Sequence, residues 1–306
     1  MYNYSRMTIS VIILSYNVKK LLKNAIDAVY HTYKEAGLQV IVVDNASSDG
    51  SASFIKKTFF KVNLIASKTN TGFAKGNNLA RTITKGNVVL FLNSDTEVKD
   101  NTIQKCLEVL TSHPELGAIT CKVMLPNGKI DYSCHRGLPT VWNTFSYWSG
   151  LSRLFPKSVM FSGYTAGHLN INESHYVDCI SGTFLMIKKS VLDKINWWDT
   201  DYFWNGEDIE LCYRIKSAGY KIWYESSVTT THFKGSSSGL WSTSAVSVTK
   251  ENKKLFAKSA ASAMRIFVNK HSKELGPRPV MLIVKFGIWL LEKYRIWKIE
   301  RGMKYA

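Results

Sequence analysis

The sequence lacks the features that define several common protein classes. Its 306 residues include only five cysteines, widely spread and without a C-x-x-C pair. This argues against a disulfide framework and a zinc finger, and for a reducing compartment. The segment before the first apolar run is short and polar, so the sequence predicts no signal peptide. With 45% hydrophobic and 21% charged residues, the composition excludes collagen-like, coiled-coil and wholly disordered chains.

The sequence also lacks a hydrophobic run long enough to span a membrane. Such a span needs about 18 or more uninterrupted apolar residues. The nearest candidate, residues 279–291, is shorter and is interrupted by Lys285. The sequence contains neither G-x-G-x-x-G nor G-x-x-x-x-G-K-[ST], the usual dinucleotide and P-loop signatures. These absences predict a cytoplasmic protein without a transmembrane helix.

Acidic residues are scarce relative to basic ones. The chain has 40 Lys and Arg against 23 Asp and Glu, which leaves a net charge of +17. Such an excess favours an anionic partner. Nucleic acid, a membrane surface and a phosphorylated small molecule all satisfy this condition, and net charge does not choose among them.

The first 125 residues alternate between two periodicities. Short, nearly continuous apolar runs predict buried strands at 9–14, 40–43, 62–66 and 88–92. Helical spacing of apolar residues predicts helices within 21–29, 54–60, 77–83 and 103–110. This alternation indicates an α/β fold with a mainly parallel sheet and helices on both faces.

Past residue 125 the alternation ends. Residues 138–164 are rich in Trp, Phe, Ser and Gly, and we interpret them as a long loop or a partly helical lid. A strand is predicted within 177–187, a helix over 207–217 and a further strand over 220–224. The Ser/Gly stretch 236–239 is a predicted linker and domain boundary.

The last segment, residues 250–304, differs in kind. It has fourteen Lys or Arg and four Glu, so it carries +10 of the total +17. Two helices are predicted, one with a stripe through Leu255 and Phe267 and one from Val280 to Tyr294. Basic amphipathic helices with Trp and Tyr suit the headgroup layer of an anionic bilayer. A hairpin packed on the core with solvated charges is the alternative, and we favour membrane association.

Polar residues gather where the predicted strands end, at 15–17, 44–50 and 93–95, with the Gly/Asn loop 70–78 between them. Each cluster alone could consist of turn residues and helix caps. However, ligands of open α/β sheets bind beyond the carboxyl ends of the strands. Three clusters that end three strands at one edge therefore predict a nucleotide site there.

These segments resemble successive motifs of family 2 glycosyltransferases. The motifs are VVDNASSDGS at 42–51, NTGFAKGNN at 70–78, LNSDT at 92–96, SGTFLMI at 181–187, GEDIELCYR at 206–214, and His232. Their order matches the family over about residues 8–235, and the chain is most similar to the bacterial rhamnosyltransferase-like branch that builds surface polysaccharides. The resemblance implies a GT-A (Rossmann-like) fold, a nucleotide-sugar donor, a divalent metal and inversion at the anomeric carbon.

The resemblance also implies a division of the chain. Residues 1–235 would form the GT-A catalytic domain, with a nucleotide-binding half at 1–125 and an acceptor-binding half at 126–235. Residues 236–306 would form a basic amphipathic helical tail.

By resemblance, Asp95 ends the D-x-D motif and ligates Mn²⁺ or Mg²⁺ together with His232. Oxygen donors with one imidazole suit Mn²⁺ well and Mg²⁺ acceptably. Asn93 stands where the family often has the first Asp, which makes it a contact to sugar or ribose. Without the family context, His232 would be a strand-end histidine with no ligand role.

The donor pocket implied by the resemblance is polar. Asp44 would hydrogen-bond the base or the ribose, and Ser15 and Asn17 line the same pocket. Lys75 and Asn77 would face the ribose or the diphosphate, although Lys75 also fits a solvated lysine at a helix start. The further predicted donor contacts are Asn70, Gly72 and Ser94.

An inverting transfer needs a carboxylate that takes the proton of the acceptor hydroxyl. By resemblance Asp208 is this base, and Glu207 orients it or binds acceptor hydroxyls. The alternative is that both acids only complement the dipole of the helix that they begin.

Aromatic residues and a glycine are predicted to shape the acceptor site. Gly182 and Trp204 belong to it by resemblance, together with Glu207. Trp197, Trp198 and Trp204 could stack on sugar faces, or they could belong to the core.

The sequence thus predicts a metal-dependent inverting glycosyltransferase of surface polysaccharide synthesis at the inner face of the bacterial membrane. Its donor would be dTDP-rhamnose or a UDP-hexose, and its acceptor a hydroxyl of a glycan or lipid-linked molecule. Two alternatives are a nucleotide- or nucleic-acid-binding protein whose tail tracks phosphates, and a catalytically silent scaffold. The sequence has no known nucleic-acid module, and the presence of Asp95, Asp208 and His232 disfavours a silent scaffold.

Overall fold

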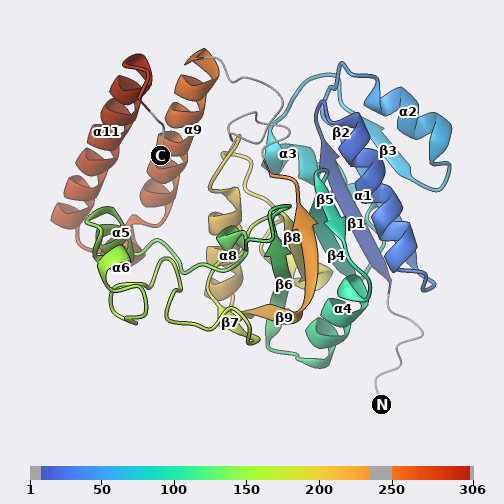
Figure 1. Cartoon of the computed structure of the whole chain (residues 1–306), viewed down its shortest axis with the longest axis horizontal. Coiled ribbons are helices and arrows are strands. Elements are labelled where there is room, and N and C mark those ends of the chain that lie inside the picture. Colours follow the sequence, from blue (N-terminus) through green and yellow to red (C-terminus); the bar gives the residue numbers. More distant parts are fainter. Residues whose placement is uncertain (1–7, 235–249, 304–306) are drawn as a thin grey trace.

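The computed structural model describes residues 8–234 and 250–303 of the chain (Figure 1). The strands are β1 (Ile9–Ser15), β2 (Leu38–Asp44), β3 (Asn63–Ala66), β4 (Val88–Asn93), β5 (Thr96–Val98), β6 (Leu116–Met124), β7 (His175–Val177), β8 (Phe184–Lys188) and β9 (Lys221–His232). The helices are α1 (Lys19–Thr32), α2 (Ser51–Thr58), α3 (Phe73–Asn78), α4 (Thr102–Ser112), α5 (Val141–Trp148), α6 (Leu151–Leu154), α7 (Lys189–Lys194), α8 (Glu207–Ser217), α9 (Lys250–Lys270), α10 (Ser272–Leu275) and α11 (Arg278–Glu300).

Within the described residues, the nine strands form one mixed sheet. Its order is β3-β2-β1-β4-β8-β6-β9-β5, and β7 pairs with β9 beside this path. The four strands from β3 to β4 are parallel, as are β6 and β9. β8 is antiparallel to both β4 and β6. The strands β3, β2, β1 and β4 therefore form a continuous parallel unit whose strands end at one edge, whereas β5 and β6 lie elsewhere in the sheet.

Successive residues of the central strands face opposite layers, as the two-residue period of a strand requires. Ile9, Val11 and Ile13 pack with α1, α2 and α4, whereas Ile12 packs with α3, α7 and α8. All four side chains are fully buried. Helices thus cover both faces, and the predicted α/β fold class is confirmed.

Some predicted elements differ in extent from the observed ones. The helix expected at 77–83 is α3 followed by a 3₁₀ turn at Arg81–Ile83. The strand expected within 177–187 is two strands, β7 and β8, which belong to different parts of the sheet. The reason is that residues 178–183 turn away between them, so the apolar run is not one extended segment.

β9 continues to His232, well past the predicted end at residue 224. Its second half is rich in Ser and Thr and has no apolar run, and its pairing with β5 and β6 makes it a strand. The segment 138–164 contains α5 and α6 and is partly helical as predicted.

The two long C-terminal helices, α9 and α11, lie side by side (Figure 1). Ala261 and Val268 of α9 pack against Met281 and Ile288 of α11 in a small cluster of their own. The predicted linker 236–239 lies outside the described residues. Among the described helices, none is both long enough and apolar enough to cross a bilayer.

Candidate active site

Three parallel strands bring polar side chains to one edge of the sheet. The register of β1 pairs Ser15 with Asp44 of β2 and places Leu14 beside Asn93 of β4. Ser15 and Asp44 are buried, yet Ser15 Oγ and Asp44 Oδ1 have no hydrogen-bond partner among the described residues. Buried polar atoms are normally paired, so this edge is suited to binding a polar ligand.

The loop after β2 is fixed onto the end of β1. Asp44 Oδ2 accepts a hydrogen bond of 3.1 Å from Ser47 N. Asn17 adopts a positive φ of 55°; its Oδ1 accepts from Ser48 N at 2.7 Å, and its N donates to Ser47 Oγ at 3.0 Å. Asn17 therefore shapes the loop and lies, exposed, at the same edge as Ser15 and Asp44.

Asn45, which the sequence analysis did not place in the site, organises the loop before α3. Its Nδ2 donates to Asn70 Oδ1 at 2.9 Å and to Gly72 O at 3.2 Å. Its Oδ1 accepts from Thr71 N at 2.9 Å. The amide can thus satisfy several backbone and side-chain groups at once. The motif position of Asn45, directly after Asp44, was the available signal.

The loop before α3 touches the loop 199–206 that leads to the predicted catalytic acids. Phe73 N donates to Phe203 O at 2.8 Å. Gly72 has φ +80°, and a Cβ at this position would lie 2.4 Å from Phe203 O. Gly72 is therefore required both by its backbone conformation and by the close approach of Phe203.

The other predicted donor residues lie in different environments. Lys75 is exposed on α3, and Asn77 is buried with its Nδ2 donating to Phe73 O at 3.0 Å. Asn93 is half-buried, and Ser94 is buried. One amide N–H of Asn77 is thus used within its own helix, whereas Lys75 is exposed.

Asp95 and His232 meet beside this edge. Thr96, the first residue of β5, pairs with His232, the last residue of β9. His232 Nε2 lies 3.3 Å from Asp95 Oδ1, and each side chain is 8% exposed. The antiparallel pairing of β5 with β9 therefore brings the two predicted metal ligands together.

Asp131 and Lys234 complete this cluster, and the sequence analysis missed both. Asp131 Oδ2 lies 3.0 Å from His232 Nδ1, and Lys234 Nζ donates to Asp131 Oδ1 at 2.9 Å. Burial alone would lower the pKa of His232, but hydrogen bonds to Asp131 and Asp95 raise it to about 9. Asp131 and His232 are 101 positions apart, and the residues around each of them do not predict that the two are in contact.

Glu207 and Asp208 begin α8, directly after Gly206 in a left-handed conformation. Asp208 Oδ2 accepts a hydrogen bond of 2.8 Å from Arg136 Nη2, and its Oδ1 accepts from Ile209 N at 2.8 Å. Arg136, 72 positions away, was missed because it lies in a stretch without periodicity. The guanidinium holds the Asp208 carboxylate in a fixed orientation.

Glu207 differs from its neighbour. Its side chain is buried, and Oε2 has no hydrogen-bond partner among the described residues. Burial, followed by the negative charge of Asp208, raises the pKa of Glu207 above its ordinary value. Glu207 is thus biased toward its protonated form beside a carboxyl group that Arg136 holds.

The tryptophans expected near the acceptor separate into two groups. Trp197 and Trp198 are fully buried and pack edge-on against Phe91, so they belong to the core. Trp204 is half-buried, with its ring 5.0 Å from that of Phe256 on α9. Gly182 is buried, and a Cβ there would lie 2.9 Å from Phe73 Cζ.

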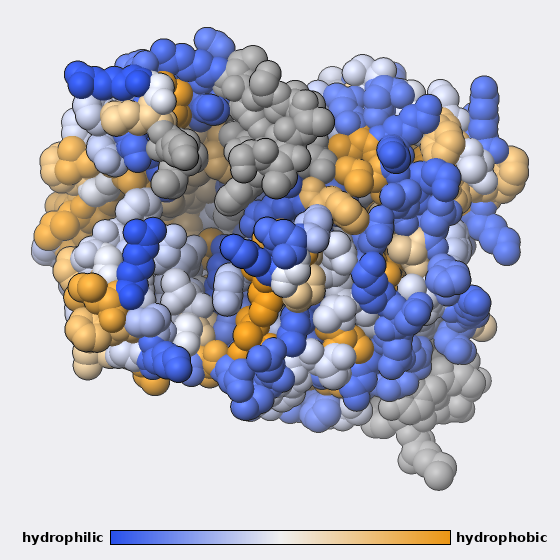
Figure 2. Space-filling view, viewed as in Figure 1, coloured by the Kyte–Doolittle hydropathy of each residue, from blue (hydrophilic) through white to orange (hydrophobic). Residues whose placement is uncertain are grey.

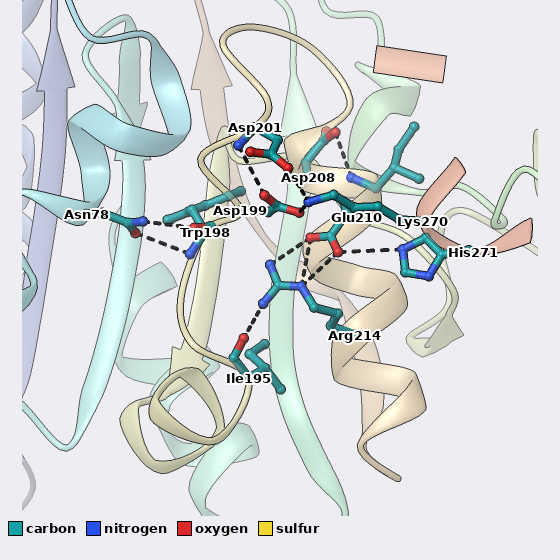
Figure 3. A network of polar contacts seen from close by, with 11 residues as sticks. Asn78, Ile195, Trp198, Asp199, Asp201, Asp208, Glu210, Arg214, Lys270 and His271 are labelled. Atoms are coloured by element: carbon teal, nitrogen blue, oxygen red, sulfur yellow. Dashed lines mark hydrogen bonds and ion pairs between the residues drawn. The ribbon is translucent and has the colours of Figure 1, made fainter. Parts of the chain in front are cut away.

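Helix α9 holds the loop before α8 in place. Lys270 pairs with Asp199, and with Asp201 at 2.7 Å (Figure 3). His271 Nε2 lies 3.6 Å from Glu210 Oε1 of α8. Ser259 Oγ donates to Trp204 O at 2.8 Å. The C-terminal helices thus support the segment that carries both acids.

A mixed sheet of this order, with polar strand ends and acids at the start of a neighbouring helix, defines a glycosyltransferase of the GT-A fold. The chain matches the model of glycosyl transferase family 2 over residues 10–196 and belongs to that family. The family resemblance, the fold and the transfer of a glycosyl group, all predicted from the sequence, are thereby confirmed.

Curated relatives are distant. The chain is 24% identical to N-acetylglucosaminyl-diphospho-decaprenol L-rhamnosyltransferase of Mycobacterium tuberculosis over 218 residues, 67% of this chain and 69% of that protein. It is 25% identical to poly-beta-1,6-N-acetyl-D-glucosamine synthase of Staphylococcus epidermidis over 224 residues, 71% of this chain. The match spans only 48% of the synthase.

A solved structure shares the fold. A mannosyltransferase from Pyrobaculum calidifontis, in complex with GDP-Man and Mn²⁺, superposes with a TM-score of 0.59 at 17% identity. The superposition covers 97% of this chain and 74% of the other.

Proposed function

We propose that this chain is a metal-dependent inverting glycosyltransferase of bacterial surface polysaccharide synthesis. It moves a sugar from a nucleoside diphosphate to a hydroxyl of a glycan or lipid-linked acceptor. The observation that carries the proposal is the contact of Phe203 with Gly72, which joins the polar sheet edge to the loop before Glu207 and Asp208. The rhamnosyltransferase relative favours dTDP-rhamnose as donor, and a UDP-hexose is the second candidate.

In this proposal the donor lies along the sheet edge. Asp44 Oδ1 and Ser15 Oγ, which have no hydrogen-bond partner in the part of the chain that the structure describes, bind the base or the ribose, with Asn17 beside them. Asn70, Gly72 and Ser94 contact the nucleotide, and Asn93 contacts sugar or ribose. The exposed Lys75 reaches the diphosphate more readily than the buried Asn77, one of whose amide N–H groups is already bonded to Phe73 O.

Asp95 and His232 fit a hard divalent cation, Mn²⁺ or Mg²⁺. Asp131 engages His232 Nδ1 and so directs Nε2 toward Asp95, which is the usual arrangement behind a metal-bound imidazole. Among the described residues, no group of three or more His, Cys, Asp or Glu side chains is placed to hold a metal. Asp95 and His232 would hold the cation together with phosphate oxygens of the donor. When bound, the cation neutralises charge on the departing diphosphate.

Asp208 is the proposed catalytic base. It takes the proton of the acceptor hydroxyl while the acceptor oxygen bonds to the anomeric carbon and the bond from that carbon to the diphosphate oxygen breaks. Arg136 holds the carboxylate for this role, since efficient transfer requires a fixed orientation. Glu207 orients Asp208 or binds acceptor hydroxyls, with Trp204 and Gly182 at the acceptor side.

We also propose that the enzyme works at the inner face of the membrane, attached through its basic tail. The excess of +10 in residues 250–304 supports attraction to anionic lipid. A lipid-linked acceptor, as named for the rhamnosyltransferase relative, would be available at that surface.

The proposal is tested by thermal unfolding with a panel of nucleoside diphosphates, each with and without Mn²⁺. A ligand at a hundred times its Kd stabilises by about 2.7 kcal/mol. We expect dTDP or UDP to stabilise the chain in a metal-dependent way, and Asp95→Asn to abolish the metal dependence. No response to any nucleotide would contradict the proposal.

Thermal unfolding with the nucleoside diphosphates, combined with a sugar-transfer assay, separates nucleotide binding from catalysis. We expect Asp208→Asn to keep nucleotide stabilisation but to lower kcat about 10²- to 10⁴-fold in a sugar-transfer assay. Asp27→Asn, at an exposed ion pair on α1, serves as the matched control. Undiminished transfer by Asp208→Asn would exclude this residue as the base.

A further inference from the structure

Helix α11 is apolar on two opposite sides. Its inner side packs Met281 and Ile288 against α9. Its outer side exposes Ile283 (71%), Phe286 (59%) and Leu290 (47%) at helical spacing. A helix in contact with water normally has a polar outer side, so the outer side of α11 indicates another partner.

The α5–α6 segment continues this apolar surface. Val141 packs into the cluster between α9 and α11, and the Arg295 guanidinium lies 5.2 Å from the centre of the Trp148 ring. Figure 2 shows hydrophobic surface gathered over α11 and over the α5–α6 segment, along the left edge of that view. The exposed apolar residues of the combined surface, here called the aromatic face, are Trp142, Phe145, Trp148, Leu154, Phe155, Val159, Met160, Leu282, Ile283, Phe286, Trp289, Leu290, Tyr294 and Trp297.

The charges around the aromatic face are mainly positive. Both glutamates of α11 are paired, Glu292 with Arg265 at 2.6 Å and Glu300 with Lys254 at 2.9 Å. The exposed cations within and beside the face are Arg153, Lys157, Lys285, Lys293 and Arg301. The negative charge of α11 is thus neutralised by α9, while these five cations are exposed.

We propose that the aromatic face inserts into the headgroup and upper acyl layer of an anionic lipid bilayer. Trp and Tyr beside Lys and Arg are the composition of interfacial protein surfaces. The charge of the surroundings complements anionic lipid, which favours a membrane over a second copy of this basic chain. Unlike attachment by tail charge alone, this insertion is hydrophobic and includes α5 and α6, which precede the tail.

Insertion would orient the catalytic acids toward the membrane. The two ends of the segment 138–164 lie close together, because Gly137 N donates to Tyr164 O at 3.0 Å. Arg136, next to Gly137, binds Asp208. On the other side, α9 packs with α11 and binds the loop 199–206. This consequence rests on the proposed transferase function, whereas insertion itself does not.

Vesicle sedimentation tests the insertion independently of any enzymatic activity. The full chain is mixed with vesicles of phosphatidylcholine alone or with phosphatidylglycerol, at low salt and at about 1 M NaCl, where the Debye length is about 3 Å. We expect binding to the anionic vesicles that is weakened, but not abolished, by salt, together with a blue shift of tryptophan fluorescence.

Phe→Ser substitutions at three positions test whether the aromatic face is the surface that binds the vesicles. We expect Phe286→Ser on α11 and Phe155→Ser after α6 each to lower the partition coefficient three- to tenfold, and the double variant to lower it more than tenfold. Phe60→Ser, at a phenylalanine that is 88% exposed and lies outside the aromatic face, should bind like the wild type. Unchanged thermal unfolding confirms that each variant is folded.

Three outcomes would overturn the proposal. They are absence of binding to anionic vesicles, complete release by salt with no effect of the variants, and a concentration-dependent dimer that Phe286→Ser dissociates in the absence of lipid. The last result would assign the face to a second copy of the chain. Vesicle binding without nucleotide stabilisation would instead contradict the transferase proposal and leave insertion supported.

Discussion

Glu207 and Asp208 are adjacent in the chain but experience different surroundings. Asp208 is bound by Arg136, whereas Glu207 is buried with an oxygen that has no partner among the described residues. Pairs of carboxyl groups with divergent environments are typical of sites in which the two groups have different roles. The contrast supports Asp208 as the proposed base and Glu207 as a group that can donate a hydrogen bond.

The raised pKa of Glu207 makes a prediction about stability. A carboxyl group whose pKa is higher in the folded state binds more protons there, so its contribution to stability is full below the unfolded pKa and is lost as pH rises. We expect the free energy of unfolding of the wild type, relative to Glu207→Gln, to fall between pH 5 and 8, by at most about 1.4 kcal/mol per pH unit.

Urea denaturation of both proteins across this pH range measures the difference. Glu173→Gln, at an exposed acid, is the control and should show no such trend. A constant difference between wild type and Glu207→Gln would mean that Glu207 is ionised throughout, with Arg136 compensating its charge.

At the scale of elements, the site depends on two loops that meet. The loop before α3 contacts the loop 199–206 through Gly72, Phe73 and Phe203. One loop belongs to the donor side and the other leads to the acids. Their contact therefore sets the distance between the donor edge and α8.

Gly72→Ala tests this contact. Alanine is strained at φ +80°, and its Cβ would lie 2.4 Å from Phe203 O. We expect a loss of at least about 2 kcal/mol in the free energy of unfolding, with weaker stabilisation by nucleotide. Gly128→Ala has a similar φ of +75° and nothing within 4 Å, so it isolates the backbone strain, about 1 kcal/mol. Equal losses for both variants would show that the loop contact contributes nothing.

The sequence predicted the strands that are recognisable from their own apolar runs. β1, β2 and β4 are apolar runs buried on both faces, and their polar ends identified the edge with Ser15 and Asp44. β5 and the second half of β9 were not predicted, since pairing rather than apolar periodicity makes them strands. β6 was not predicted either, although most of its side chains are buried. Arg136 and Asp131 were missed because they lie in a stretch without periodicity and their partners are distant in sequence.

For the whole molecule, the division at residue 235 remains a prediction. The structure describes contact between the tail and the loop 199–206, which leads to the proposed catalytic acids, through Ser259, Lys270 and Ala263 of α9. Ala263 Cβ would lie 3.0 Å from a Cβ at Gly206. Such close packing couples the stability of the tail to that of the loop before α8.

We expect the full chain to unfold in one cooperative transition, and Ala263→Leu to lower its midpoint. The larger side chain has no space beside Gly206, and overpacking of this kind costs about 1–3 kcal/mol, or roughly 2–5 °C. Leu255→Ala, on an exposed part of the same helix, should leave the midpoint unchanged. The number of unfolding transitions, measured by calorimetry, distinguishes a single cooperative unit from an independently folded tail. An independent tail would give two transitions, of which Ala263→Leu would shift only one and the nucleotide would shift only the other.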